Sequence, residues 1–358
     1  MLIPFVRVNR QFVRFHQLVS LLLASVFFCH SSYSSPSISA GIWMNYSYQT
    51  NSSSDQNTNG DVNSEALILY LDHTDKDSEW TLSSEVRWGP GAFTDSANNS
   101  SGDNTAIHKL WIARPLNDGV LTIGKSQVPF GWKTANFWAG DLLLGGYGDQ
   151  MDVGIKYSAT HAGGPLSYQA AYYHADDFGQ TSTDTTDDNG HWGSATTFRK
   201  MQTFVGNIDY KLSDNHQVSF SAQSGKLQDL TSVDNKLSGH HHGLNLHYKG
   251  NFDSVYLKAQ LFAVDRKLPD GSDVENTRAA MELGYSQDQY FYYVEASTAD
   301  SDSNSVGMVG AHAVGMTYDY GPGWFYAEYL WQDGFIGRNG DTGAGNFSAL
   351  YLTADYYF

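Results

Sequence analysis

The stretch Phe347–Phe358, FSALYLTADYYF, decides the fold class of this 358-residue chain. From Leu350 onward its even-numbered positions are apolar or aromatic, and the polar residues Thr353 and Asp355 stand between them. Successive side chains of a β-strand point to opposite faces, so this alternation predicts a strand with one apolar and one polar face. The segment 255–263, VYLKAQLFA, repeats the pattern.

The same alternation recurs along the chain from about residue 38, in stretches of about ten residues. We predict sixteen strands, near residues 37–50, 64–73, 79–88, 105–114, 119–127, 151–160, 165–175, 199–211, 217–226, 240–250, 254–264, 277–287, 289–299, 308–319, 322–332 and 347–358. Their connections alternate between short turns, such as 115–118, and long loops, such as 176–198.

Short turns on one rim and long loops on the other are typical of a transmembrane barrel. Lipid offers no hydrogen-bond partners to the backbone, and a closed antiparallel barrel satisfies every strand internally. The alternative is a soluble β-sandwich or β-helix, but such folds give no reason for aromatic residues on an outward face. We therefore expect residues 36–358 to form a single all-β transmembrane barrel of about sixteen strands, with short periplasmic turns and long extracellular loops.

Composition narrows the class further. The net charge is −17, which argues against nucleic acid as a partner. A lone cysteine excludes an internal disulfide, and no run of eighteen apolar residues predicts a helical span. Low overall apolar content (41%) together with 14% aromatic residues disfavours a soluble α/β enzyme.

The first 35 residues predict a secretory signal peptide that is cleaved. Arg7, Arg10 and Arg14 precede the apolar run 18–28, and small serines follow it. Removing these arginines leaves a mature charge of −20. A lipoprotein signal at Cys29 is the alternative, although the bulky Phe28 before it is unsuited to that processing.

The motif at 121–131, LTIGKSQVPFG, resembles the phosphate-selective porin O and P family of Gram-negative outer membranes. The resemblance extends loosely over the mature chain through strand number, loop alternation and the aromatic Phe358, which is similar to an outer-membrane assembly signal. It implies a sixteen-stranded, trimeric porin whose third loop folds into the pore. The composition of residues 128–150 agrees, because three leucines and two tryptophans there require burial. An external lid or a trimer latch is the alternative for this loop.

Strand parity selects the charged residues that would face the pore, since a lipid-facing Lys or Arg at the bilayer midplane costs about 2–4 kcal/mol. For Lys125 the parity matches lipid-facing Ile123, so an inward position requires a bulge or a place at the rim. The predicted pore-lining and constriction residues are Lys125, Lys133, Asp141, Lys109, Arg87, Glu85, Lys156, Lys258, Arg278, Glu282 and Glu328.

The sign of the charge departs from a phosphate pore. The predicted long loops carry five basic and 21 acidic residues, which would concentrate cations at the mouth. Solubility and divalent bridging to lipopolysaccharide are equally good reasons for these carboxylates. We therefore do not carry phosphate selectivity over from the resemblance.

The sequence contains three further groups of residues that could carry chemistry. Adjacent residues alternate faces, so at most His240 and His242 of the run 240–242 point the same way, and we expect no metal site. The acidic residues Asp184, Asp187 and Asp188 match no calcium-binding spacing. Ser238 beside the histidines could suggest a rim hydrolase, but no oriented nucleophile setting accompanies it.

The sequence thus predicts a non-enzymatic outer-membrane porin for passive diffusion of small hydrophilic solutes or ions, needing no cofactor. Its expected partners are outer-membrane lipid, lipopolysaccharide and two further copies of itself. The alternative functions are a barrel-type outer-membrane enzyme and a structural or adhesive barrel that does not conduct.

Overall fold

The computed structural model describes residues 35–50, 60–92, 104–131, 135, 150–176, 194–234, 236–303, 306–337 and 339–358. The strands are β1 (Ser37–Gln49), β2 (Asp61–Thr74), β3 (Thr81–Trp88), β4 (Thr105–Leu116), β5 (Gly119–Gln127), β6 (Met151–Thr160), β7 (Leu166–Ala175), β8 (Phe198–Ser213), β9 (His216–Asp229), β10 (Leu237–Phe252), β11 (Val255–Lys267), β12 (Asp273–Gln287), β13 (Tyr290–Ser301), β14 (Val309–Asp319), β15 (Trp324–Ile336) and β16 (Thr342–Tyr357). One short 3-10 turn, η1 (Pro90–Ala92), follows β3.

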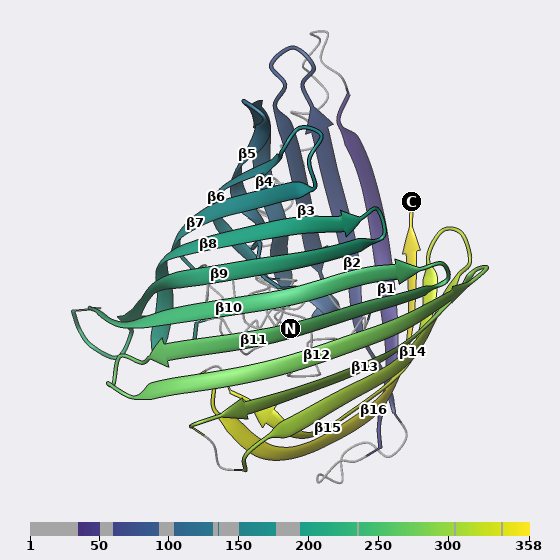
Figure 1. Cartoon of the computed structure of the whole chain (residues 1–358). Helices are drawn as coiled ribbons and strands as arrows, with labels where there is room; N and C mark the ends of the chain where they lie inside the picture. Colours follow the sequence, from purple (N-terminus) through teal and green to yellow (C-terminus); the bar gives the residue numbers. More distant parts are fainter. Residues whose placement is uncertain are drawn as a thin grey trace, which may run out of the picture.

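The sixteen strands form one closed barrel in which every strand pairs antiparallel with its sequence neighbours. The first strand closes the ring against the last, from Gly41 opposite Tyr357 to Gln49 opposite Ala349. In Figure 1 the purple first strand and the yellow last strand therefore lie side by side. Closure leaves no open sheet edge, which is the condition for a β-structure to cross lipid. The predicted all-β transmembrane barrel is confirmed.

Exposed and buried positions alternate along the strands. On β12, for example, Met281 and Leu283 are exposed while Glu282 is fully buried. The same inversion holds for β16, where Leu352 is exposed and Thr353 and Asp355 are buried. Large apolar side chains thus cover the outer wall and polar ones line the interior, as expected for a barrel surrounded by lipid.

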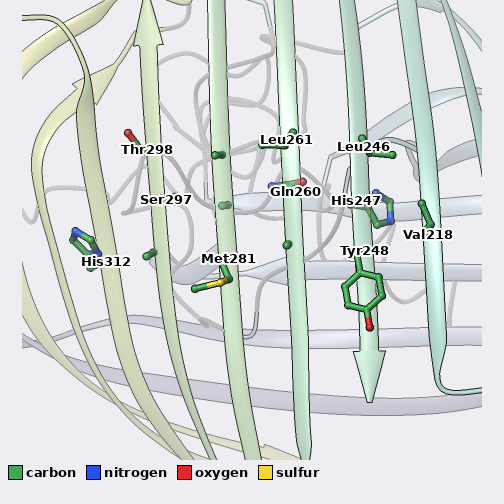
Figure 2. A pocket seen from close by; sticks show the side chains of 14 residues that line it. Val218, Leu246, His247, Tyr248, Gln260, Leu261, Met281, Ser297, Thr298 and His312 are labelled. Carbon is green, nitrogen blue, oxygen red and sulfur yellow. The ribbon is translucent and has the colours of Figure 1, made fainter. Parts of the chain in front are cut away.

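A hollow of about 560 Å³ interrupts this apolar outer wall over β9 to β14. Small residues make it, because Ala259, Ala279 and Ala296 lie at outward positions between larger apolar neighbours. Figure 2 shows the wall here, with Leu261 and Met281 among the side chains that line the hollow. The surface that lines this hollow is mostly apolar.

Strand bounds differ from the sequence expectation mainly at the long-loop ends. Strand β11 continues to Lys267 and β12 begins at Asp273, so the connection expected over 265–276 shrinks to residues 268–272. The cause is that strands continue past the apolar band into water, where alternation loses its apolar half and the sequence signal fades. Glu79, expected in a strand, lies in the turn before β3 with a φ of 60°.

No helix among the described residues is both long enough and apolar enough to cross a membrane. Residues 1–34 lie outside the described residues, and they include Cys29 and all of the predicted signal peptide except its last residue, Ser35. Asp184, Asp187 and Asp188 also lie outside the described residues.

Candidate functional site

The barrel interior brings the first group of predicted residues together on the wall formed by β3 to β6. Glu85 and Arg87 are buried on the inner face of β3, and the Arg87 Nε donates to Glu85 Oε1 at 2.8 Å. The Arg87 guanidinium also lies over the Trp43 ring, 5.3 Å from its centroid. On β6, the half-buried Lys156 donates from Nζ to the Gln127 carbonyl oxygen at 2.8 Å.

Two irregularities set the positions of Lys109 and Lys125 on this wall. A bulge at His108 shifts the β3–β4 register, so that Lys109 lies opposite the inward Glu85. On β5 the alternation breaks at Gly124, whose φ is 124°. Ile123 before it is exposed, whereas Lys125 after it is only 4% exposed. The register nevertheless runs on without a bulge and sets Lys125 opposite the outward residues Leu110 and Val153, so the positive φ at Gly124 accompanies a buried lysine at an outward register position.

The second group lies on the wall formed by β11 to β15. Glu282 of β12 is fully buried and sits directly opposite Lys258 of β11, whose Nζ donates to Glu282 Oε1 at 2.8 Å. The Tyr256 hydroxyl donates to the same oxygen. On β15, Glu328 is buried and accepts from the Tyr293 hydroxyl. Arg278, also buried, lies over the Phe262 ring at 5.4 Å, toward the long-loop end of β12.

The two groups face each other across the barrel. In a ring of sixteen sequential strands, β4 and β12 lie half a circumference apart. The β3–β6 wall carries Arg87, Lys109, Lys125 and Lys156 against two buried acids, Glu85 and Asp152. The β11–β15 wall carries the buried acids Glu282, Glu295 and Glu328, and it also carries Lys258, Arg266 and Arg278. Glu295 lies directly opposite Glu282. Basic groups therefore predominate on the β3–β6 wall, whereas the two signs balance on the β11–β15 wall, and this difference creates a field across the interior.

The segment that follows β5 crosses between these walls. Phe130 is 2% exposed and makes an edge-to-face contact with Phe262 of β11, at 5.3 Å between ring centroids. Val128 joins the same buried cluster with Tyr173 of β7. Further along, the Ala135 N–H donates to Glu282 Oε2 at 2.6 Å. Ala135 also packs against the inner cluster that contains Leu330 and Tyr351. Lys133 and Asp141 lie outside the described residues.

Sequence reasoning missed Lys200 and Arg266, which are respectively 3% and 0% exposed in the interior. For Arg266 a signal existed: continuing the alternation of β11 past Val264 places it inward. For Lys200 none did, because an irregularity at Gln202, with a φ of 49°, changes which positions of β8 face inward.

The histidine run at 240–242 is divided between the two faces of β10. His241 is fully buried, and its Nε2 lies 3.1 Å from the Thr203 hydroxyl. His240 and His242 lie on the outer face, where His242 is exposed. The three rings and Ser238 therefore do not converge on one hydrolytic site.

The sequence matches no protein-family model, and a search of curated proteins finds no match. Solved structures do resemble it. The outer membrane channel DcaP of Acinetobacter baumannii is 14% identical, with a TM-score of 0.63 over 92% of this chain and 99% of that one. OmpF from Salmonella typhi, in a complex with daunomycin, is 10% identical, with a TM-score of 0.61 over 90% and 97%. The anion-selective porin from Comamonas acidovorans is 12% identical, with a TM-score of 0.60 over 90% and 99%. At such identities the likeness shows the fold alone: this chain has the sixteen-stranded barrel that outer-membrane porins also have.

Proposed function

We propose that this protein is an outer-membrane porin, through which small hydrophilic solutes or ions diffuse passively. The observation that carries the proposal is the crossing segment after β5, which meets the far wall at Phe262 and Glu282. A segment that crosses a barrel lumen narrows it, and long loops in compact domains are often functional. The narrowest point would lie where residues 128–150 approach the charged walls.

The charged side chains on the two walls support a pore that selects among ions, and not a barrel whose lumen is plugged. Rings and ladders of charged side chains set ion preference in pores. Lys125, Lys133 and Asp141 would act at the constriction, with Lys109, Arg87, Glu85 and Lys156 on one wall and Lys258, Arg278, Glu282 and Glu328 on the other. Acidic residues in the long loops would enrich cations at the mouth.

Location and assembly follow from the same proposal. The apolar outer wall suits contact with membrane lipid. The parts of the strands that extend past this apolar band, at the long-loop end, would contact lipopolysaccharide. We infer a homotrimer, since related folds include a protein described as the trimer form of OmpT from Vibrio cholerae, at a TM-score of 0.56. An N-terminal signal peptide ending near residue 35 would direct secretion through the inner membrane.

The proposal involves no covalent step and no cofactor. A barrel-type enzyme would need a nucleophile, a base and an oriented third group in one place. The division of His240, His241 and His242 between two faces disfavours the one such cluster that the sequence suggested.

Reversal potentials in planar bilayers, under a KCl gradient and with or without added phosphate, test the proposal. We expect discrete channels with cation preference and no phosphate block. Anion preference with phosphate block would instead mean that the inward lysines determine the ion selectivity. Folded protein that inserts without conducting would overturn the porin function and favour a structural barrel.

A further inference from the structure

Three side chains of metal-ligand type meet on the outside of the barrel, away from the lumen. His240 and His242 stand two residues apart on the outer face of β10, with ring centroids 5.1 Å apart. Asp265 of β11 lies directly opposite His242 in the register. One ligand atom from each of the three residues lies within 4.8 Å of the other two.

The strand geometry explains why these three converge. A period of two sends His241 into the barrel and leaves His240 and His242 on the outer face. The antiparallel register then adds a side chain from the neighbouring strand, because directly opposed residues share a face. A search along one strand finds only the two histidines. The third ligand comes from the pairing of β10 with β11.

The surroundings place this set just beyond the apolar band of the outer wall. The next outward positions toward the short-turn end are the exposed Leu244 and Ala263. On the other side begins a polar surface. Lys226 and Lys267 flank His240 in the register. Glu275 flanks Asp265 on β12.

These neighbouring charges act in both directions. The ammonium groups of Lys226 and Lys267 oppose a bound cation, although Lys267 Nζ lies 3.9 Å from Asp273 Oδ1. The carboxylates of Asp265 and Glu275 favour a bound cation. Within the part of the chain that the structure describes, neither the two imidazoles nor the Asp265 carboxylate makes a hydrogen bond or ion pair, so no interaction has to be broken before they bind an ion.

We propose that His240, His242 and Asp265 form a site for a divalent transition-metal ion of the Zn²⁺ type. Two neutral imidazoles and one carboxylate are a ligand set that suits such an ion, and water would complete the tetrahedron. Small side-chain rotations bring the three ligand atoms around one ion. The ion would join β10 to β11 at the outer edge of the lipid-facing band. It would not enter the channel, so the site is independent of conduction.

Calorimetric titration of the purified, folded, detergent-solubilised protein with ZnCl₂ tests this site. We expect one Zn²⁺ per chain, with binding unaffected by excess Mg²⁺, which prefers oxygen ligands. His240→Ala and His242→Ala should each weaken binding at least about tenfold. His161→Ala is the matched control, because His161 is an exposed histidine in the turn after β6.

Circular dichroism checks that every variant is folded. The conservative Asp265→Asn variant is included because it is expected to fold even if a histidine variant does not. It keeps the shape of the side chain and removes the anionic ligand, so weaker Zn²⁺ binding in folded Asp265→Asn protein supports the site even where a histidine variant does not fold. The proposal is overturned by wild-type protein that binds no Zn²⁺ saturably. Undiminished binding in folded His242→Ala and Asp265→Asn protein would overturn it equally.

Discussion

The Ala135 N–H donates a hydrogen bond of 2.6 Å to Glu282 Oε2, joining the segment after β5 to the inner face of β12. Glu282 also accepts from Lys258 Nζ and from the Tyr256 hydroxyl. A fully buried carboxylate is costly unless such donors surround it, and removing one partner of a buried pair is strongly destabilising. Glu282 thus holds the crossing segment and supplies negative charge at the same point.

Glu282→Gln should move the selectivity toward anions. The amide keeps an acceptor for Ala135 but removes one negative charge from the wall and leaves Lys258 unneutralised. The reversal potential under a KCl gradient measures the shift. Glu275→Gln is the matched control, because Glu275 lies on the outward face of the same strand. Equal shifts in both variants would mean that net charge matters and the position of Glu282 does not.

Lys133→Glu should shift the selectivity toward cations, because Lys133 belongs to the predicted constriction loop. The comparison variant is Lys236→Glu, which makes the same charge change in the exposed loop between β9 and β10, where Lys236 pairs with Asp234 at 3.0 Å. That surface pair is screened by salt and contributes little. In 1 M KCl we therefore expect the Lys133 effect to persist and the Lys236 effect to fade. An unchanged reversal potential for Lys133→Glu would place this residue outside the constriction.

Most of the architecture could be predicted because lipid imposes a strict period on each strand. All sixteen predicted stretches coincide with strands, and Leu352 and Thr353 occupy the faces that parity assigned. The signal failed where the barrel leaves lipid. The alternation predicts a loop at Asp265 and Arg266, where the structure has strand β11, because neither face of the strand has to be apolar beyond the lipid. The sequence therefore predicts the part of each strand that crosses lipid, but not the strand residues that extend beyond it at the long-loop end.

The interior was less predictable because irregularities change which positions face it. The bulge at His108 turns the side chain of Lys109 inward, and the irregular backbone at Gln202 does the same for Lys200. A bulge has no fixed residue signature, apart from the glycine that some bulges contain. Contacts across the barrel, such as that of Phe130 with Phe262, depend on closure and have no local signal at all.

Gly124→Ala should destabilise the barrel by about 1–3 kcal/mol, the usual cost of a strained backbone conformation. The φ of 124° disfavours any side chain, and an added Cβ would lie 2.8 Å from Trp111 Cα and closer still to the Leu110 carbonyl oxygen. Thermal unfolding followed by circular dichroism measures the loss. Gly206→Ala is the control, since a Cβ there meets nothing within 4 Å. Equal melting temperatures for the two variants would contradict the role assigned to Gly124.

Leu261→Lys tests which side of the wall faces lipid. Leu261 is 60% exposed near the middle of β11, and its neighbour Gln260 is 5% exposed on the inner face, where it accepts from Asn245 at 3.0 Å. A lysine facing lipid near the midplane should cost about 2–4 kcal/mol. Gln260→Lys, the same new charge one residue away, should cost only about 1 kcal/mol for the lost hydrogen bond. Guanidinium unfolding of protein reconstituted in vesicles compares them. Because a one-residue change of register exchanges the two faces, the opposite order of stabilities would mean that β11 presents Gln260 to lipid and Leu261 to water.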